Sequence, residues 1–472
     1  MINCLKPFLQ YKHSGVPWVG DVPRHWQVLP NRALFSEVKD RNHPDEEMLS
    51  VTIANGIVRQ KTLLEGSSKK DSSNLNKSAY KLVQPGDIAY NKMRAWQGAI
   101  GVSALRGIIS PAYVVMRLRN SDDLPTYFHH LYRTPQFAKE AERWSYGITS
   151  DMWSLRPEHF KMIYTPKPPP AEQAAIVCFI DHSSAKIERA IRAKKKLIAF
   201  LDEQKQSITH RTVTRGLDPN VPIRPSGTPW LGNIPQHWET RKIKFLVSIT
   251  GGMTPNKSVE RFWGGSMPWV TPKDMKVRRI THSRDHITES ALRSTPIAII
   301  QPPAVLIVVR GMILARKFPV AITSVPVTVN QDMKALIPRS AISADYMVSL
   351  LIGIQRELLR LVEIAGHGTC CLRTDSWENL ALPIPPASEQ EHITVFLQQE
   401  LETINLAAAR AEREIRLLHE YRTRLVADLV TGKLDVRAAL TQLRDQAELK
   451  RHFLPDTESD VNLEAVLEEE NL

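Results

Sequence analysis

The chain has 472 residues, which is too long for one ordinary hydrophobic core and fits two to four domains. Its 42% hydrophobic and 24% charged residues are typical of a soluble globular protein and exclude wholesale disorder. The net charge is +12, or +19 without the seven carboxylates of residues 455–472. This excess suits a polyanion such as DNA, although many basic proteins bind no nucleic acid.

The chain opens with a turn-rich motif that occurs twice. Residues 15–26 are GVPWVGDVPRHW and residues 227–238 are GTPWLGNIPQHW, with seven identities in twelve positions at an offset of 212. A second set of matches, at an offset of 217, includes the two PPxxEQ segments that end at Gln173 and Gln390. The residues between the matched ends are unlike. We therefore favour a common frame that holds two different domains over a duplication for size alone.

Residues 31–150 form the first unlike block, and their short apolar runs between turn residues predict an α+β domain. Its predicted elements are the strands Lys81–Val83, Asp87–Tyr90 and Tyr113–Leu118 and one amphipathic helix around Leu124–Trp144. The loop after the second strand mixes amide, cationic and aromatic side chains, which suit the edges of DNA bases. The predicted DNA contacts of this half are Asn91, Lys92, Arg94, Trp96, Gln97, Tyr146 and Arg156. Any one of them alone is better explained as an ordinary polar loop residue, and it is their clustering at matched places in a duplicated frame that favours DNA contact.

A long helix is predicted after each PPxxEQ segment. The first would run from Ala171 to Val213, which is 43 residues or about 65 Å, because no Pro or Gly interrupts it. Apolar residues recur at heptad spacing in both helices, which predicts a coiled-coil seam. The seam residues are Ile180, Ile187, Ile191, Ile198, Leu201, Leu397, Leu401, Ile404, Ile415 and Leu418. Two seams of equal length most simply bury each other as an antiparallel pair, although each helix could instead pack on its own domain.

Residues 243–367 form the second unlike block, which is also predicted to be α+β. Its predicted elements are the strands Val305–Val309, Val320–Thr323 and Lys334–Ile337 and one helix around Ala344–Val362. Glycines at residues 251–252 would let backbone N–H groups approach phosphates. The predicted DNA contacts of this half are Thr254, Lys273, Arg310, Asn330, Gln331 and Arg373.

Features of catalysis, metal binding and secretion are missing from the sequence. It holds no Asn/Asp-Pro-Pro-Tyr/Phe methyltransferase motif, no phosphate-binding loop and no zinc spacing among its four cysteines, of which Cys178 is predicted to be a core residue. Residues 202–205 look like a solvated helix face, and His367 looks like a loop residue. The N-terminus lacks a signal-peptide core, and no run of about 18 apolar residues could span a bilayer. We expect a cytoplasmic, non-catalytic chain with no membrane partner.

Several motifs together resemble the specificity subunit of type I restriction-modification systems. They are the two PWxGxxPxHW openings, the two PPxxEQ helix starts, and residues 90–113, 263–275, 308–336 and 430–436. The resemblance covers about residues 15–436 and leaves the acidic tail outside it. It implies an α+β fold with two target-recognition domains separated by two long antiparallel coiled-coil helices, related by a pseudo-two-fold internal repeat.

The resemblance also implies a function and partners. Each domain would contact one half of a bipartite, asymmetric target in double-stranded DNA, and the helices would set the spacer and dock two methyltransferase subunits. Those partners, together with restriction/translocase subunits, would bring S-adenosylmethionine, ATP and Mg²⁺, none of which this chain would bind. The competing hypotheses are a stand-alone DNA-binding regulator and a self-sufficient nuclease or methylase.

The repeat also predicts domain boundaries. The two recognition domains are predicted at residues 1–167 and 217–384. The two spacer helices are predicted at residues 168–216 and 385–436, and the acidic tail at residues 437–472.

Overall fold

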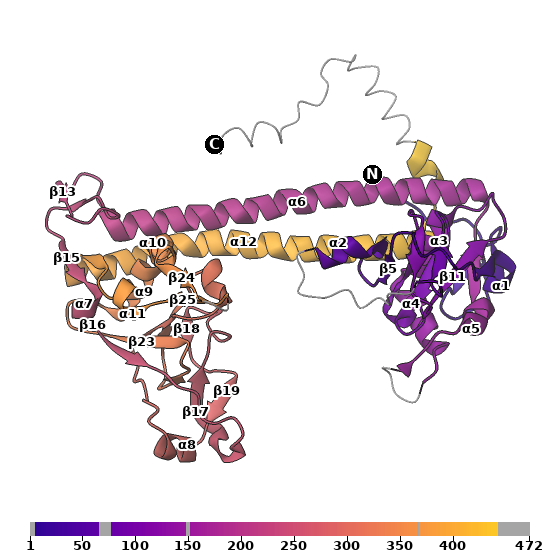
Figure 1. The fold of residues 1–472 in the computed structure, drawn as a ribbon. Coiled ribbons are helices and arrows are strands. Elements are labelled where there is room, and N and C mark those ends of the chain that lie inside the picture. Colours follow the sequence, from indigo (N-terminus) through magenta and orange to yellow (C-terminus); the bar gives the residue numbers. More distant parts are fainter. Residues whose placement is uncertain (1–4, 66–76, 148–151, 366–367, 442–472) are drawn as a thin grey trace. The chain divides into compact units, whose positions relative to one another are not determined.

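The computed structural model describes residues 5–65, 77–147, 152–365 and 368–441 (Figure 1). The predicted acidic tail beyond residue 441 and His367 therefore lie outside the described residues. The chain forms two compact units, residues 1–192 with 414–472 and residues 193–413, which we call the first and second unit. The long helices α6 (Pro170–Arg215) and α12 (Ala387–Val430) each contribute to both units. No helix of the described residues is long and apolar enough to cross a membrane.

The core of the first unit is a four-stranded antiparallel sheet with the order β4-β11-β8-β9. These strands are β4 (Phe35–Val38), β8 (Ile88–Asn91), β9 (Ile100–Val102) and β11 (Tyr113–Leu118). The smaller strands are β1 (Tyr11–His13), β2 (Asp21–Pro23), β3 (Gln27–Pro30), β5 (Leu49–Thr52), β6 (Gly56–Arg59), β7 (Lys81–Val83), β10 (Gly107–Ile109) and β12 (Tyr164–Lys167). The short helices are α1 (Asn31–Leu34), α2 (Gln60–Leu64), η2 (Ala95–Gln97), α3 (Pro125–Tyr132), α4 (Pro135–Arg143) and α5 (Pro157–Met162).

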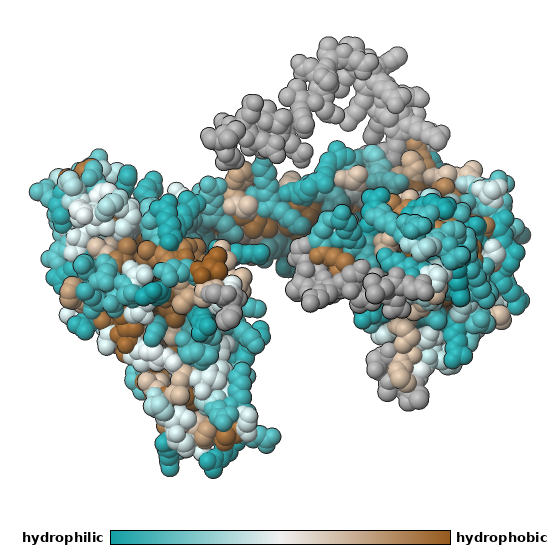
Figure 2. All heavy atoms as spheres, viewed as in Figure 1, coloured by the Kyte–Doolittle hydropathy of each residue, from teal (hydrophilic) through white to brown (hydrophobic). Residues whose placement is uncertain are grey.

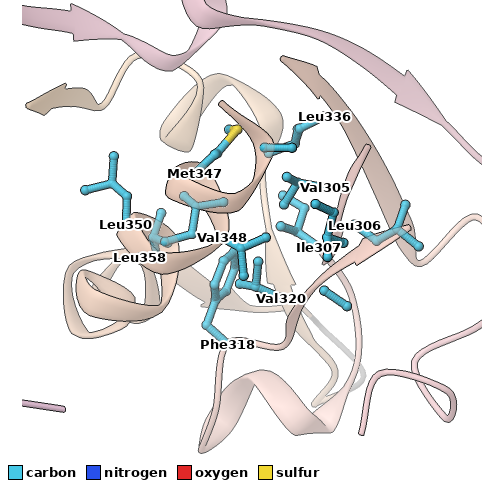
Figure 3. Close-up of a cluster of buried hydrophobic side chains, with 14 of the residues drawn as sticks. Val305, Leu306, Ile307, Phe318, Val320, Leu336, Met347, Val348, Leu350 and Leu358 are labelled. Atoms are coloured by element: carbon cyan, nitrogen blue, oxygen red, sulfur yellow. The ribbon is translucent and has the colours of Figure 1, made fainter. Parts of the chain in front are cut away.

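The core of the second unit is a five-stranded sheet with the order β16-β23-β20-β21-β18. These strands are β16 (Val247–Gly251), β18 (Arg279–Ile280), β20 (Val305–Val308), β21 (Val320–Thr323) and β23 (Met333–Pro338). The smaller strands are β13 (Ile223–Pro225), β14 (Asn233–Pro235), β15 (Glu239–Lys242), β17 (Trp263–Val270), β19 (Asp285–Ile287), β22 (Thr328–Val329), β24 (Val362–Ile364), β25 (Cys370–Leu372) and β26 (Ala381–Ile384). The short helices are α7 (Ile243–Leu246), η4 (Glu260–Phe262), α8 (Glu289–Ser294), η5 (Met312–Ala315), α9 (Ala344–Gly353), α10 (Gln355–Arg360) and α11 (Thr374–Trp377). Figure 3 shows Val305, Ile307, Met347 and Val348 in the apolar core between β20 and α9.

The two unlike blocks share one sheet topology. The order β4-β11-β8-β9 of the first unit is repeated as β16-β23-β20-β21 in the second, and the strand pairs are antiparallel in both. The units differ mainly in the segment that connects the first two of these strands along the chain, from β4 to β8 and from β16 to β20. The first unit there carries the β5–β6 hairpin and β7, while the second carries β17, β18, β19 and α8. The duplication therefore extends into the blocks whose sequences look unrelated.

The two long helices run antiparallel and lie against each other within each unit. In the first unit Arg422 of α12 bonds Glu188 of α6, and Leu425 and Leu429 share a core with Ile180. In the second unit Lys205 Nζ donates to Asn405 Oδ1 at 2.9 Å. The two contacts are separated by 17 residues along α6 and by 17 residues along α12. Both contacts therefore fit the same antiparallel register of the two helices. The predicted fold class, an α+β duplication with two long antiparallel helices, is confirmed.

The start of each long helix also packs against the core of the unit that precedes it in the sequence, as the alternative interpretation expected. Ile176 and Phe179 belong to the core of the first unit, and Ile393 and Leu397 to that of the second. Cys178 lies on the opposite face of α6 and is exposed, so the prediction that it is a core residue was wrong. Its neighbours at positions 176, 179 and 180 form the buried face, which leaves position 178 toward solvent.

Both predicted amphipathic helices are broken in two. In the first unit Pro135 begins α4, and the Thr134 hydroxyl caps the new helix by accepting from Phe137 N at 3.2 Å. In the second unit the break follows Gly353. There Gln206 of α6 donates to the carbonyl oxygens of Ile352 and Gly353 at 3.1 and 2.9 Å. A side chain from the long helix thus satisfies carbonyls that a continuous helix would have used itself.

The repeated motifs interlock around one glutamate in each unit. Glu172, the glutamate of the first PPxxEQ segment, accepts from Trp26 Nε1 at 3.1 Å and pairs with His25 Nε2 at 2.7 Å. In the second unit Glu389 pairs in the same way with Trp238 Nε1 at 3.0 Å and His237 Nε2 at 2.8 Å. The HW and EQ pairs recur because they bond to each other and fix the start of each long helix.

The following glutamine ties each long helix to the short helix of its domain. Gln173 Oε1 accepts from Leu124 N at 2.7 Å, just before α3. Gln390 Oε1 accepts from Ser343 N at 2.9 Å, just before α9. Each glutamine also donates to the carbonyl of a proline in its own motif, Pro168 or Pro385. The unlike blocks are therefore attached to the duplicated frame by matched bonds.

We expect Gly432→Ala to destabilise the first unit strongly. Gly432 follows α12 at φ +78°, and a Cβ there would lie 2.4 Å from Cδ of Pro23 and 3.0 Å from the Trp26 ring. Left-handed backbone costs a non-glycine residue about 1–2 kcal/mol, and overpacking adds about 1–3 kcal/mol. Thermal unfolding should therefore begin several degrees lower. Gly20→Ala is the control, because Gly20 has φ +72° but open space around its Cβ position. Equal shifts for the two variants would contradict the close contact.

Candidate nucleic-acid interface

In the first unit, three segments meet beside the end of β8. The backbone N–H of Leu155 donates to the carbonyl of Lys92 at 2.9 Å, and the rings of Trp96 and Trp153 contact edge to face at 5.4 Å. Tyr146 and Ser154 form a backbone bridge. The structure thus brings the loop at residues 91–97 together with the segments that carry Tyr146 and Arg156. The loop is far from both of these segments in sequence.

Within this group the predicted contact residues divide into supporting and exposed side chains. Asn91 Oδ1 accepts from Met93 N at 3.0 Å, and Trp96 Nε1 donates to Met93 O at 3.0 Å, so both hold the loop in shape. Arg94, Gln97, Tyr146 and Arg156 are exposed, and Lys92 is half-buried. The exposed members offer a phenol, an amide and two guanidinium groups to a ligand that approaches this edge.

In the second unit the predicted residues gather at one edge of the five-stranded sheet, where β16 and β20 end and β23 begins. Thr254 Oγ1 bonds Gln331, and the backbone N–H of Arg310 donates to Asp332 O at 3.3 Å. Arg310 also forms a backbone bridge with Cys371, two residues before Arg373. Lys273 is exposed in the turn after β17. The predicted contacts of this half therefore lie mostly on one side of the unit.

Two predicted residues at this edge have their side chains engaged within the protein. Asn330 is buried, and its amide donates to Asp332 Oδ2 at 2.9 Å, so we leave it out of the proposed DNA contacts. The exposed Arg373 bonds Asp375 Oδ2 at 3.1 Å, and these hydrogen bonds raise the pKa of its guanidinium. Gly252 has a local role, since a Cβ there would lie 2.1 Å from Val329 O. The adjacent N–H of Met253 already donates to that oxygen at 3.0 Å.

One pair of arginines occupies matched positions in the two units. Arg156 and Arg373 directly precede α5 and α11, are 217 residues apart in sequence, and are both exposed. The duplicated frame therefore supplies one arginine to each edge, while the neighbouring loops differ.

Sequence reasoning missed several cations near the first edge. Lys81 donates from Nζ to the carbonyl of Tyr113 at 2.6 Å, and Tyr113 is paired with Asn91 across β8 and β11. Lys39 and Arg41 also lie close to Lys81. They come from strands and turns before β8, so their separation in sequence hid the grouping. No local pattern would have marked Lys81, because β7 has only three residues and Lys81 is the first of them.

The predicted seam residues are buried to different degrees. Ile180, Ile187, Ile191, Leu397, Leu401 and Ile404 are buried, while Ile198, Leu201, Ile415 and Leu418 are half-buried. Other apolar side chains of the long helices are exposed: Leu197, Phe200, Leu406 and Leu417 are 46%, 55%, 65% and 52% exposed. Figure 2 shows hydrophobic patches between hydrophilic residues on the visible face of both units.

The arrangement of these residues is typical of a binding protein. It is a duplicated α+β scaffold with two long antiparallel helices, in which each unit presents amide and guanidinium groups at one edge of its sheet. Among the described residues, no group of three or more His, Cys, Asp or Glu side chains could hold a metal ion.

Comparison with known proteins confirms the predicted resemblance. Residues 235–415 match the family described as the type I restriction modification DNA specificity domain. The specificity subunit of the Escherichia coli type I restriction enzyme EcoR124I/EcoR124II is 34% identical over 168 residues, which is 35% of this chain and 42% of that protein. The MjaIX specificity subunit of Methanocaldococcus jannaschii is 30% identical over 35% of this chain and 38% of that protein. The chain thus spans about two fifths of the length of these curated relatives.

A solved structure supports the same fold over a longer stretch. A chain from work on complex assembly and conformational transition of the type I R-M system superposes with a TM-score of 0.63 at 15% identity. The superposition covers 87% of this chain and 99% of that chain. The likeness at this identity concerns the fold alone, and it includes both units.

Proposed function

We propose that this chain is a DNA specificity subunit of a type I restriction-modification complex, in which each unit contacts one half of a bipartite target. The observation that carries the proposal is the pairing of a duplicated frame with two unlike sets of exposed polar side chains. Arg94 and Gln97 in the first unit and Arg310 and Gln331 in the second are exposed groups of the kind that bond guanine and adenine edges. The sets differ in their other members, with an exposed phenol in the first and an exposed lysine ammonium in the second, so the proposed target is asymmetric.

The long helices are proposed to set the spacer between the half-sites and to dock two methyltransferase subunits. Their exposed apolar side chains support docking, since large apolar groups left in solvent commonly mark interaction surfaces. We further propose that the chain itself is non-catalytic and that methylation, ATP-driven translocation and cleavage belong to the methyltransferase and restriction subunits. The predicted division into two recognition domains, two helices and a tail is part of this proposal.

Selection of DNA duplexes tests this function. The full chain, alone and with the proposed methyltransferase partner, is incubated with random duplexes, and the bound fraction is sequenced. We expect two unlike conserved blocks separated by a gap of fixed length. Full affinity without the methyltransferase would favour a stand-alone regulator. A single continuous block would contradict the bipartite proposal.

Docking through the long helices predicts that Phe200→Ser and Leu406→Ser weaken binding of the methyltransferase. Burying a large apolar side chain contributes about 1.5–3 kcal/mol, so each variant should lower the affinity about 10- to 100-fold, measured by titration of the full chain. Ile299→Ser is the control, because Ile299 is 44% exposed but lies in the segment between α8 and β20, outside the long helices. Equal losses for all three variants would show that these helix positions have no special role.

A further inference from the structure

A group of cations surrounds Tyr113 in the first unit, and we call Arg41, Lys81, Lys92 and Arg94 the basic cluster. Backbone pairing brings these residues together, since Arg41 forms a backbone β-bridge with Lys81, and Asn91 of β8 is paired with Tyr113 of β11. Lys81 lies close enough to Lys92 and Arg41 for their charges to affect it, and Arg94 similarly affects the phenol of Tyr113. Four positive side chains from three segments therefore gather at one place.

Few carboxylates neutralise this cluster. Glu37 lies near Lys81, but its oxygens are engaged by Lys161 Nζ at 3.0 Å and by Lys39 Nζ at 3.9 Å. Asp40 pairs with His43, and Asp87 pairs with Arg117. Within the described residues, no ion pair is present for Arg41, Lys92 or Arg94. The cluster therefore holds more positive charge than its surroundings compensate.

Lys81 is the most unusual member because its side chain is buried. It is 7% exposed, and the bond from Nζ to Tyr113 O is the hydrogen bond that the structure gives its ammonium group. Burial lowers the pKa of this ammonium and the neighbouring cations lower it further, while Glu37 opposes the shift. Structural lysines in a core are normally paired with a carboxylate, and Lys81 bonds a neutral carbonyl instead.

We propose that the basic cluster binds a backbone phosphate of the DNA half-site contacted by the first unit. This inference rests on the proposed function, and it adds Arg41 and Lys81 to the DNA contacts that were predicted from the sequence. Phosphate fits better than a base edge, because the cluster consists of cations alone and Lys acts as a point charge toward phosphate. The adjacent exposed Gln97 would then be held at the correct height over the groove.

The test compares salt dependence with sequence preference. Full chains carrying Arg41→Gln, Lys92→Gln or Lys81→Met are titrated with the selected duplex and with a scrambled duplex of equal length at several salt concentrations. Each lost phosphate contact should reduce the slope of log K against log salt by about 0.9, and affinity should fall by the same factor for both duplexes. Lys12→Gln is the control, since it removes one exposed cation of β1 from the same unit. Its slope should stay unchanged.

The outcomes separate this inference from the proposed function. An unchanged slope in Arg41→Gln and Lys92→Gln, or a loss confined to the selected duplex, would overturn the phosphate cluster. A wild-type chain that prefers no duplex, with slopes that still fall in the variants, would overturn the proposed function and leave the cluster standing. Because Lys81→Met removes a buried charge, its folding is checked by thermal unfolding. The exposed Arg41→Gln keeps the test decisive in either case.

Discussion

Exchanging residues 31–150 for the equivalent block of another protein of this fold should change one half of the DNA target and leave the other half intact. The structure gives the physical reason, because this block forms its own sheet and carries its own set of exposed groups. Each mismatched base pair costs about 1–3 kcal/mol, so loss of one half-site should lower affinity for the original duplex at least about 100-fold. Duplex selection with the chimaera measures both halves at once.

The junction of the block decides whether the chimaera folds. Asn31 Oδ1 accepts from Tyr132 Oη and Thr165 Oγ1, both at 2.7 Å, and Tyr127 Oη donates to Val430 O at 2.9 Å. The exchange should therefore keep Asn31, Tyr127 and Tyr132. A second chimaera without them is the matched control and should unfold at lower temperature. Altered preference in both half-sites, or in neither, would contradict the modular account.

Inserting seven residues into only one long helix should abolish assembly, while inserting seven into both should restore it with a longer spacer. In the first unit the start of α6 and the end of α12 both meet Trp26, through Glu172 and Gly432. In the second unit the opposite ends meet Trp238, through Glu389 and Gly216. Helices of unequal length cannot satisfy both meeting points.

The matched insertions would be placed between Arg192 and Ala193 in α6 and between Leu417 and Leu418 in α12. These positions are matched by counting along both helices from the Glu188–Arg422 and Lys205–Asn405 contacts. Seven helical residues add about 10 Å, which corresponds to about three base pairs of DNA. Duplex selection should show that increase with unchanged half-sites. A double insertion that leaves the spacer unaltered would contradict the role of the helices as a ruler.

The duplicated frame could be predicted from sequence because its residues bond to each other. The HW and EQ pairs meet at Glu172 and Glu389, so selection for those contacts leaves a visible repeat. The first long helix was predicted to within two residues of its bounds, and the second was predicted to follow its proline cluster, since heptad spacing and flanking prolines are local signals. The strands β7, β11 and β21 were predicted at their observed bounds for the same reason.

Other features depend on tertiary contacts that no local pattern records. The common sheet order of the two units is hidden because strand pairing constrains apolar character and length, which many sequences satisfy. The break after Gly353 depends on Gln206 from a distant helix. The basic cluster joins Arg41, Lys81 and Lys92 only after β7 and β8 have paired with their partners.

The most direct test of the central claim is to map modified adenines in the genome of the host, with and without the gene for this chain. If each unit contacts one half of a bipartite target for partner methyltransferases, modified adenines should occur in a two-part, asymmetric motif with a fixed gap, and they should disappear when the gene is deleted. Modification that persists unchanged in the deletion strain, or that depends on the gene but lies in one continuous motif, would contradict the account.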